Sequence, residues 1–280
     1  MRGLVLGGGG MLGRAMAEWG RERGVAVLAL DRARADIADP ERLAYWVDRF
    51  RPQVVFNCAA YTQVDDCETE RDHAFEINGR AVAHVAAAAW RVDASLVHVS
   101  TDYVFAGTAD TPYREDDATA PRSVYGESKL AGEREALAYD RSLVVRASWL
   151  FGPGGPNFAA TMMRLMDSGH QDLRVVDDQR GCPTYTPFLA DALWRLAELG
   201  TTGVMHYRNR EPVTWHGFTT EIARLWNPQV MVTPVTTDEF PRPAERPAYS
   251  VLDVSRFEAA VGERVPSWND GLVQYLARLR

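Results

Sequence analysis

Short apolar runs alternate with amphipathic segments through the first half of the chain. The runs are mainly hydrophobic rather than alternating, which is typical of strands that are buried on both faces. They lie at Gly3–Leu6, Val25–Leu30, Val54–Cys58, Ser95–Ser100 and Leu143–Ala147. Because these runs are separated by helical segments, the sequence predicts an α/β fold, a doubly wound parallel sheet with right-handed crossovers.

The segments between the strands carry helical signals. Met11–Arg23 shows helical periodicity and is followed by Gly24. Asp39 followed by Pro40 is typical of a helix start, with Asp39 as the N-cap and Pro40 as the first helical residue. We expect that helix to run to about Phe50. Further helices are predicted at Glu70–Trp90 and Val124–Tyr139.

The pattern changes after Trp149. Gly152–Pro156 is rich in turn residues, the elements beyond it are shorter, and Glu239–Pro247 forms a proline-rich loop. We therefore expect a first domain at residues 1–149 and a smaller α/β substrate-binding lobe at residues 150–280. Part of the second half, about residues 186–208, should return to the sheet.

Composition limits the classes of function. The chain has 280 residues, with 46% hydrophobic and 25% charged residues, as in ordinary globular proteins. Its net charge of −7 and the lack of a Lys/Arg-rich run argue against a nucleic-acid partner. The longest apolar stretch, Ala81–Trp90, is too short to span a membrane.

Cysteine and histidine usage indicates the compartment and the metal content. The three cysteines lack CxxC spacing, which favours a reduced, cytoplasmic protein. The N-terminus moves directly into a strand pattern, so we expect no signal peptide. No histidine pair has metalloprotease spacing, and we expect no zinc site.

A glycine-rich loop follows the first strand. Gly7, Gly10 and Gly13 open the next helix, where glycines let a backbone approach a pyrophosphate at a helix N-terminus. Asp31 ends the second strand, where an acidic group binds a ribose 2′-hydroxyl, as in NADH. Arg32 could instead hold the 2′-phosphate of NADPH, so the choice of cofactor stays open. The sequence thus predicts a Rossmann-type dinucleotide site.

The chain has a single lysine among its 31 basic residues, and it stands beside a tyrosine. Tyr125 and Lys129 lie one helical turn apart and face the same way. A nearby ammonium should lower the pKa of the phenol toward the neutral range. Thr101, just after the fourth strand, would hold a carbonyl beside that phenol. These residue types suit hydride transfer to a ketone with protonation of its oxygen.

Together these motifs resemble the extended short-chain dehydrogenase/reductases, and among them the dTDP-4-dehydrorhamnose reductase family. Ser100–Phe105 and Tyr125–Glu133 are the most distinctive segments, although the second is shared with related sugar-nucleotide reductases. The other segments that carry the resemblance are residues 57–65, 146–149, 157–158, 178–184, 214–216 and 246–247. The resemblance implies reduction of a dTDP-linked 4-keto sugar, the last step of dTDP-L-rhamnose synthesis, with NADPH or NADH.

The resemblance also implies roles for residues at matching positions. Tyr125 would donate the proton, and Lys129 would support it and bind the nicotinamide ribose. The expected cofactor contacts are Gly10, Met11 and Leu12 on the pyrophosphate, Asp31 on the ribose, Asp36 and Ile37 near the adenine, and Ala60, Tyr61 and Thr62 further in. The expected substrate contacts are Thr101, Asp102 and Trp149, with Val64, Tyr103 and Asn157 as weaker candidates. Trp149 could instead be core. Arg246 could bind the diphosphate or be a solvated charge.

The chain departs from the family in places. Some members carry a metal-binding glutamate at a dimer contact where this chain has Ala15, which puts that metal bridge in doubt, although a homodimer remains possible. Cys58 and Cys67 are read as small buried hydrophobes. Two alternatives stay open: another sugar-nucleotide reductase or epimerase, and a non-catalytic regulatory subunit on the same fold.

Overall fold

A parallel sheet of six strands forms the centre of the computed structural model, which describes residues 1–279. The strand order is β10–β5–β4–β3–β1–β2. The bounds are β1 (Arg2–Leu6), β2 (Ala26–Leu30), β3 (Val54–Asn57), β4 (Ser95–Thr101), β5 (Ser142–Ala147) and β10 (Gly203–Tyr207). The five strands predicted in the first half are confirmed, and β10 pairs in parallel with β5 at the edge.

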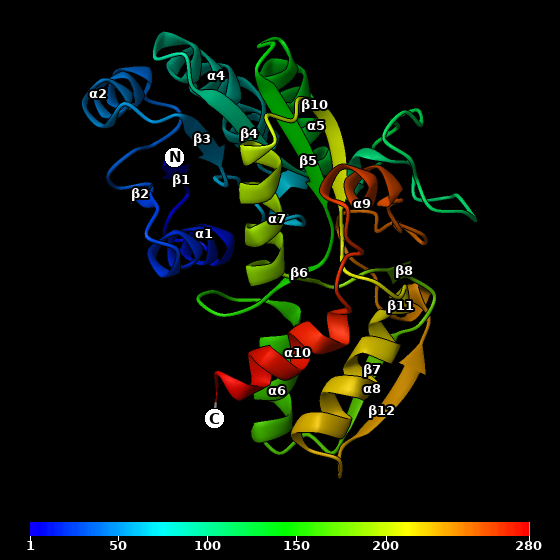
Figure 1. Cartoon of the computed structure of the whole chain (residues 1–280). Helices are drawn as coiled ribbons and strands as arrows, with labels where there is room; N and C mark the ends of the chain where they lie inside the picture. The colour runs from blue at the N-terminus through cyan, green and yellow to red at the C-terminus, as the bar shows by residue number, and fades with distance from the viewer. Residues whose placement is uncertain (280) are drawn as a thin grey trace.

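Helices cover both faces of the sheet because successive strand residues point to opposite sides. Val5 belongs to a core shared with α1 (Met11–Glu22), α7 (Thr186–Glu198) and α9 (Ser255–Val261). Its neighbours Leu4 and Leu6 face a second core. That core is shared with α2 (Pro40–Phe50), α4 (Ala81–Arg91) and α5 (Val124–Leu137). Figure 1 shows α1 and α7 on one side of the sheet. The doubly wound α/β fold is therefore confirmed.

The long helix predicted at Glu70–Trp90 is interrupted. It consists of α3 (Arg71–Phe75), a π-helical turn η2 (Glu76–Arg80), and α4. Asn78 in this turn is buried; its carboxamide accepts from the Tyr61 amide at 2.8 Å and donates to the Ser128 hydroxyl at 3.1 Å. Such turns are often found at functional sites, and here the turn connects the end of β3 to α5.

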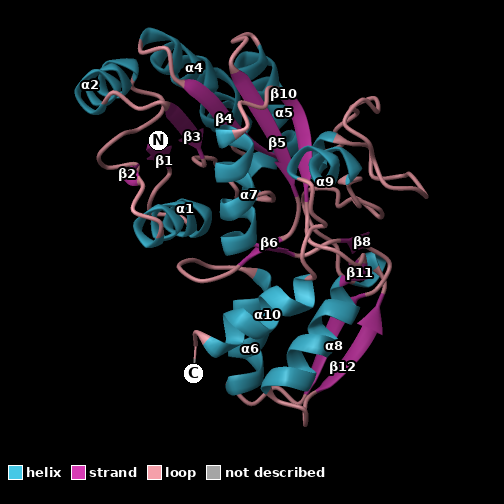
Figure 2. Cartoon of the chain, viewed as in Figure 1, coloured by secondary structure: helices cyan, strands magenta, loops and turns pink. Residues whose placement is uncertain are grey.

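The second half builds a lobe beyond the carboxyl ends of the strands (Figure 2). Its two-stranded sheet pairs β7 (Asp172–Val176) with β12 (Met231–Val235) in parallel. The helices α6 (Phe158–Asp167), α8 (Trp215–Trp226) and α10 (Trp268–Ala277) share a separate core with it. Two short pairings complete the lobe, β6 (Leu150–Phe151) with β9 (Thr184–Tyr185) and β8 (Arg180–Gly181) with β11 (Val213–Thr214).

Later segments also pack against the main sheet. The segment 186–208 supplies α7 and β10, and Phe257 of α9 joins the same core. Phe257 lies in a part of the chain that the sequence assigned to the lobe. Three short 3-10 turns also link longer elements. They are η1 (Asp66–Glu68), η3 (Asp102–Val104) and η4 (Thr237–Glu239).

Candidate active site

Three cavities that share lining residues lie along the carboxyl ends of the sheet. The glycine-loop cavity, between Gly7 and Tyr61, has a volume of about 390 Å³. The central cavity, around Tyr125, measures about 530 Å³, and the lobe cavity, around Arg246, about 420 Å³. Gly9, Gly10, Cys58 and Ala60 line both of the first two, and Tyr103 and Trp215 line both of the last two. A crevice at this edge is where open α/β sheets bind ligands.

The glycine-rich loop can pack tightly against the neighbouring backbone only because it has no side chains. Gly7 has φ +77°, and a Cβ there would lie 2.7 Å from the Ala59 nitrogen. A Cβ on Gly13 would lie 2.2 Å from the Gly7 carbonyl oxygen. The N-terminus of α1 has no side-chain cap and no acidic residue in its first turn. This geometry fits the pyrophosphate of a dinucleotide.

The glycine-loop cavity collects residues expected at the pyrophosphate, at the adenosine and further in along a cofactor. Those residues are Gly7, Gly10, Asp31, Arg32, Asp36, Ile37, Ala60 and Tyr61. The Arg32 guanidinium is paired with Asp36 at 3.1 Å and its side chain is 74% exposed. Arg32 and Asp31 therefore both stay available to a ribose or its phosphate. His73 and Ile77 also line this cavity and were not anticipated.

The central cavity collects the residues expected at the reacting centre together with several expected cofactor contacts. They are Met11, Leu12, Gly13, Thr62, Val64, Thr101, Asp102, Tyr103, Tyr125, Lys129 and Trp149. Thr101 is the last residue of β4, whereas Tyr125 and Lys129 lie on α5, whose N-terminus is capped by the Ser123 side chain. Residues distant in the sequence are thus brought together as the motifs predict.

Lys129 is buried with its ammonium held by the sheet. Its side chain is only 2% exposed, and Nζ donates to the Val99 carbonyl oxygen at 2.7 Å. Burial lowers the pKa of Lys129 to about 8, and the charge of Glu133 partly opposes this. The lysine therefore remains mostly protonated at neutral pH, although close to its titration range.

Tyr125 differs from the sequence-based expectation. Burial, the largest effect, and the charge of Asp102 raise the pKa of this phenol, whereas the Thr101 hydroxyl lowers it. The lowered pKa that the sequence predicted from the neighbouring lysine is therefore wrong. A phenol with a raised pKa keeps its proton until a strong base forms beside it, as a proton donor must.

A buried ion pair lies behind the catalytic helix. Arg146 of β5 donates to both carboxylate oxygens of Glu133, at 2.9 and 2.8 Å, and both side chains are at most 5% exposed. Ser100 donates to the same carboxylate at 2.6 Å. These bonds join the end of β4, the middle of α5 and β5, and so fix Thr101 relative to Lys129.

The lobe cavity combines arginines with aromatic rings. Arg174, Arg242 and Arg246 line it together with Phe158, Trp215 and Phe240. Arg246 pairs with Asp65 at 2.9 Å, and its side chain is 19% exposed. It is therefore a partly buried residue of this cavity and not a fully solvated charge. Cations and flat apolar surfaces suit a nucleoside diphosphate.

Trp149 marks the junction of the central and lobe cavities. Its ring stacks on Trp215 with centroids 3.4 Å apart and planes 6° apart, and its backbone has φ 48°. A positive φ on a bulky residue is strained and is often found at functional sites. Trp149 therefore lines the site, as expected, and is not buried core. Trp215 was not expected as a site residue, although the segment 214–216 is part of the family resemblance.

Asn157 is placed differently from the expectation. Its side-chain oxygen caps α6 by accepting from Ala160 at 3.0 Å. Its amide donates to the carbonyls of Gly152 and Gly155 and to the Tyr275 hydroxyl. The carboxamide is thus occupied in fixing the turn after β6, and Asn157 does not line the three cavities.

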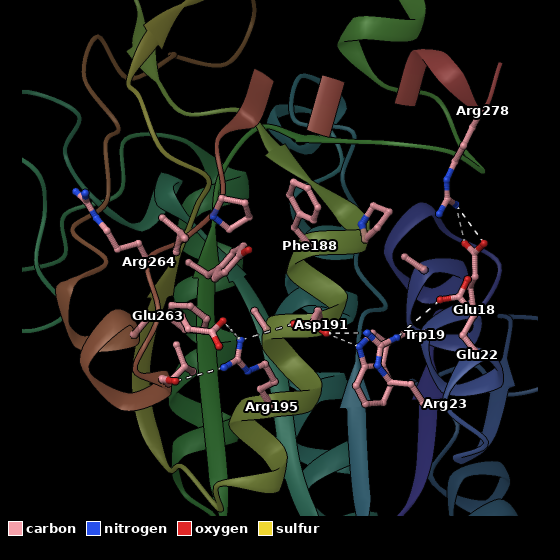
Figure 3. Close-up of a pocket in the computed structure, with 18 residues that line it drawn as sticks. Glu18, Trp19, Glu22, Arg23, Phe188, Asp191, Arg195, Glu263, Arg264 and Arg278 are labelled. Carbon is pink, nitrogen blue, oxygen red and sulfur yellow. Dashed lines mark hydrogen bonds and ion pairs between the residues drawn. The ribbon is translucent and has the colours of Figure 1, made fainter. Parts of the chain in front are cut away.

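Another cavity, of about 450 Å³, lies away from these motifs (Figure 3). It is lined by α1, α7 and the segment after α9, and ion pairs such as Arg195–Glu263 and Arg278–Glu18 close its rim. Ala15 lines it without offering a ligand. Within residues 1–279 no cluster of three or more His, Cys, Asp or Glu side chains could hold a metal ion.

Comparisons with known proteins show which family this chain resembles. The family model described as RmlD substrate binding domain matches residues 1–280. A dTDP-4-dehydrorhamnose reductase from Streptomyces griseus is 44% identical, over 98% of this chain and 92% of that protein. The crystal structure of a dTDP-4-dehydrorhamnose reductase from Clostridium acetobutylicum superposes with a TM-score of 0.95 at 38% identity, covering 100% of this chain and 99% of that one. The enzyme of the same name from Bacillus anthracis, solved in complex with NADP, gives 0.95 at 35% identity and 99% of each chain.

Proposed function

The chain belongs to the RmlD substrate binding domain family, and from this membership we propose that it reduces dTDP-4-dehydro-β-L-rhamnose to dTDP-L-rhamnose with NAD(P)H. One observation carries the proposal. Thr101, Tyr125 and Lys129 line one cavity, which shares residues with a glycine-loop cavity and with an arginine-lined lobe cavity. A reducing cofactor and a sugar nucleotide would thus meet at the tyrosine.

The residues of the central cavity divide the chemistry among them. A bound nicotinamide would supply the hydride for the carbonyl carbon of the sugar, and the carbonyl oxygen would then take the C=O electron pair and need a proton. Tyr125 transfers its phenolic proton to that oxygen, and Thr101 holds the oxygen by a hydrogen bond. Lys129 anchors the nicotinamide ribose with its buried ammonium and stabilises the tyrosinate that remains.

The lobe cavity would hold the nucleotide. Arg246 and Arg242 offer positive charge for the diphosphate, and Phe158 offers an apolar surface for the base. The stacked pair of Trp149 and Trp215 would then border the sugar on one side, where the two cavities meet. NADH and NADPH both suit the other end of the crevice, since Asp31 and Arg32 line it side by side.

We also propose that the protein works in the cytoplasm, as its three free cysteines favour. In residues 1–279 no helix is long and apolar enough to cross a membrane. The sugar nucleotide is its small-molecule partner.

The proposal is tested by following NADPH and NADH oxidation with enzymatically prepared dTDP-4-dehydrorhamnose, alongside UDP- and GDP-linked 4-keto sugars. We expect rapid oxidation with the dTDP sugar and formation of dTDP-L-rhamnose. Faster turnover of another nucleotide sugar would identify a related reductase. Absence of oxidation with every sugar would identify a regulatory subunit.

Tyr125→Phe isolates the proton donor. The phenylalanine keeps the ring, so the fold and the affinity for NADPH should stay near those of the wild type. Turnover should fall about 10²–10⁴-fold because the alkoxide loses its acid. Tyr45→Phe, which removes an exposed hydroxyl, is the matched control. Near-normal turnover of the Tyr125→Phe variant would refute the assignment.

A further inference from the structure

A buried carboxyl beside the reacting centre lacks the partners that such a group normally has. Asp102 opens η3 and is only 2% exposed. Its Oδ1 accepts a hydrogen bond from the Thr101 hydroxyl at 3.0 Å, and its Oδ2 is buried without a hydrogen-bond partner in the described chain. A buried, incompletely satisfied carboxylate is costly, so its persistence in a site calls for a functional explanation.

The hydrogen bonds of Thr101 can be counted. A threonine hydroxyl has one proton to donate and two lone pairs that accept. One lone pair of Thr101 Oγ1 accepts from the Tyr103 backbone amide at 3.2 Å. An ionised Asp102 has no proton of its own, so the contact at 3.0 Å then consumes the single proton of Thr101. In that state Thr101 can only accept further hydrogen bonds.

The proposed reaction needs the opposite arrangement. Hydride transfer places negative charge on the sugar oxygen, which must be met by donors and not by lone pairs. A neutral Asp102 can donate its own proton to Thr101. The Thr101 proton is then free to point at the sugar oxygen beside the Tyr125 phenol.

The surroundings of Asp102 favour its neutral form. Burial, the largest effect, raises the pKa of Asp102 to about 6, and the nearby hydroxyls of Ser250 and Thr101 only partly oppose this. The titratable groups that feel its charge are Tyr103 of η3, Tyr125 of α5 and Cys182 of the turn between β8 and β9. None of them is basic, and Arg246 is engaged by Asp65.

We propose that Asp102 is a positioning residue that sets the direction of the Thr101 hydrogen bond, with the neutral carboxylic acid as the form active in reduction. The inference rests on the proposed function, because it concerns the oxygen that the reduction protonates. Neutral Asp102 turns the Thr101 proton toward the substrate, and ionised Asp102 withdraws it. As the pH rises, the catalytic rate constant should fall while cofactor affinity stays unchanged.

Asp102→Asn provides the test because its carboxamide stays neutral at every pH and has an NH2 group that can donate to Thr101, as the neutral acid can. The measured quantity is the ratio of kcat for the variant to kcat for the wild type from pH 5 to pH 8. Titrations that both proteins share cancel in this ratio. We expect a ratio near one at pH 5 that rises about tenfold by pH 8, less than the roughly 10²–10³-fold effect of one oxyanion donor because Tyr125 remains. The Kd for NADPH should be the same for both.

Two results would overturn the proposal. A ratio that does not change with pH would show that Asp102 ionisation does not control the step. A variant that is about 100-fold slower at every pH would show that the carboxylate itself is required, for example as a proton relay. Wild-type reduction of the dTDP sugar at any pH supports the proposed function in either case, so the two failures can be told apart.

The Thr101→Val background tests whether Asp102 changes kcat through the Thr101 hydroxyl. With no hydroxyl to turn, Asp102→Asn should leave kcat unchanged across the pH range in that background. A ratio that still rises with pH would contradict a role through Thr101. If Asp102→Asn does not fold, the ratio of wild type to Thr101→Val gives the same information. That ratio should fall as the pH rises, and a constant value would refute the proposal.

Discussion

At the scale of single residues, the lone lysine shows how burial selects between two cations. Lys129 reaches the Val99 carbonyl at 2.7 Å from a position that is 2% exposed. A compact ammonium fits there, whereas a guanidinium is a broad planar fork with donors on several sides. Arginines elsewhere lie mostly at the surface, where that shape is unconstrained. The packing at position 129 therefore favours lysine over arginine.

Lys129→Arg keeps the charge and changes only the shape of the cation. We expect a loss of at least about 100-fold in kcat/KM and weaker NADPH binding, because the guanidinium displaces the ribose or pushes Tyr125 out of place. Steady-state kinetics and fluorescence titration with NADPH measure these effects. Arg134→Lys, on the exposed side of α5, should have wild-type rates. Wild-type kinetics in Lys129→Arg would mean that the lysine is a chance survivor.

At the scale of elements, buried hydrogen bonds join α5 to β5 and to the π-helical turn η2. The catalytic helix is held by the bidentate pair of Glu133 and Arg146, and by Asn78, which reaches Ser128 from the π-helical turn. Neither contact could be read from the local pattern, since the partners lie 13 and 50 residues apart and their direction depends on packing. The predicted boundaries of α5 itself are confirmed within about two residues.

Glu133→Leu leaves Arg146 buried without its counter-ion. We expect a loss of about 3–5 kcal/mol in the free energy of unfolding. The double variant Glu133→Leu, Arg146→Met replaces the pair by apolar groups and should recover most of that loss. Urea unfolding of the wild type and of the single and double variants provides the measurement. Equal stability of Glu133→Leu and the wild type would show that the pair contributes little.

At the scale of the whole molecule, the site exists only where sheet and lobe meet. Asp65 follows the segment that lines the glycine-loop cavity, yet it pairs with Arg246 from the proline-rich loop and bonds to the Ala244 amide at 3.2 Å. Trp149 and Trp215 close the same junction from opposite parts of the lobe. The arginines and aromatics of the lobe cavity therefore depend on the tertiary fold for their common surface.

Arg246→Met should separate nucleotide binding from cofactor binding. Losing a charged hydrogen bond to the diphosphate, about 1.5–3 kcal/mol, should weaken dTDP binding about 10–100-fold and leave the Kd for NADPH unchanged. Isothermal titration calorimetry with each ligand checks both values. Arg122→Met is the control. Arg122 pairs with Glu245, which lies in the same loop as Arg246, but Arg122 does not line the lobe cavity. An unchanged dTDP affinity would remove Arg246 from the site.

The sequence by itself determined the five strands of the first half, the glycine loop and the grouping of Thr101, Tyr125 and Lys129. Those features depend on local periodicity and on residues that follow strands, and the ends of parallel strands always meet at one edge. The tertiary structure alone decided the raised pKa of Tyr125, the helix-capping role of Asn157 and the stacking of Trp215 on Trp149. Burial and long-range contacts set these properties, because desolvation and partner identity depend on which segments the fold brings together.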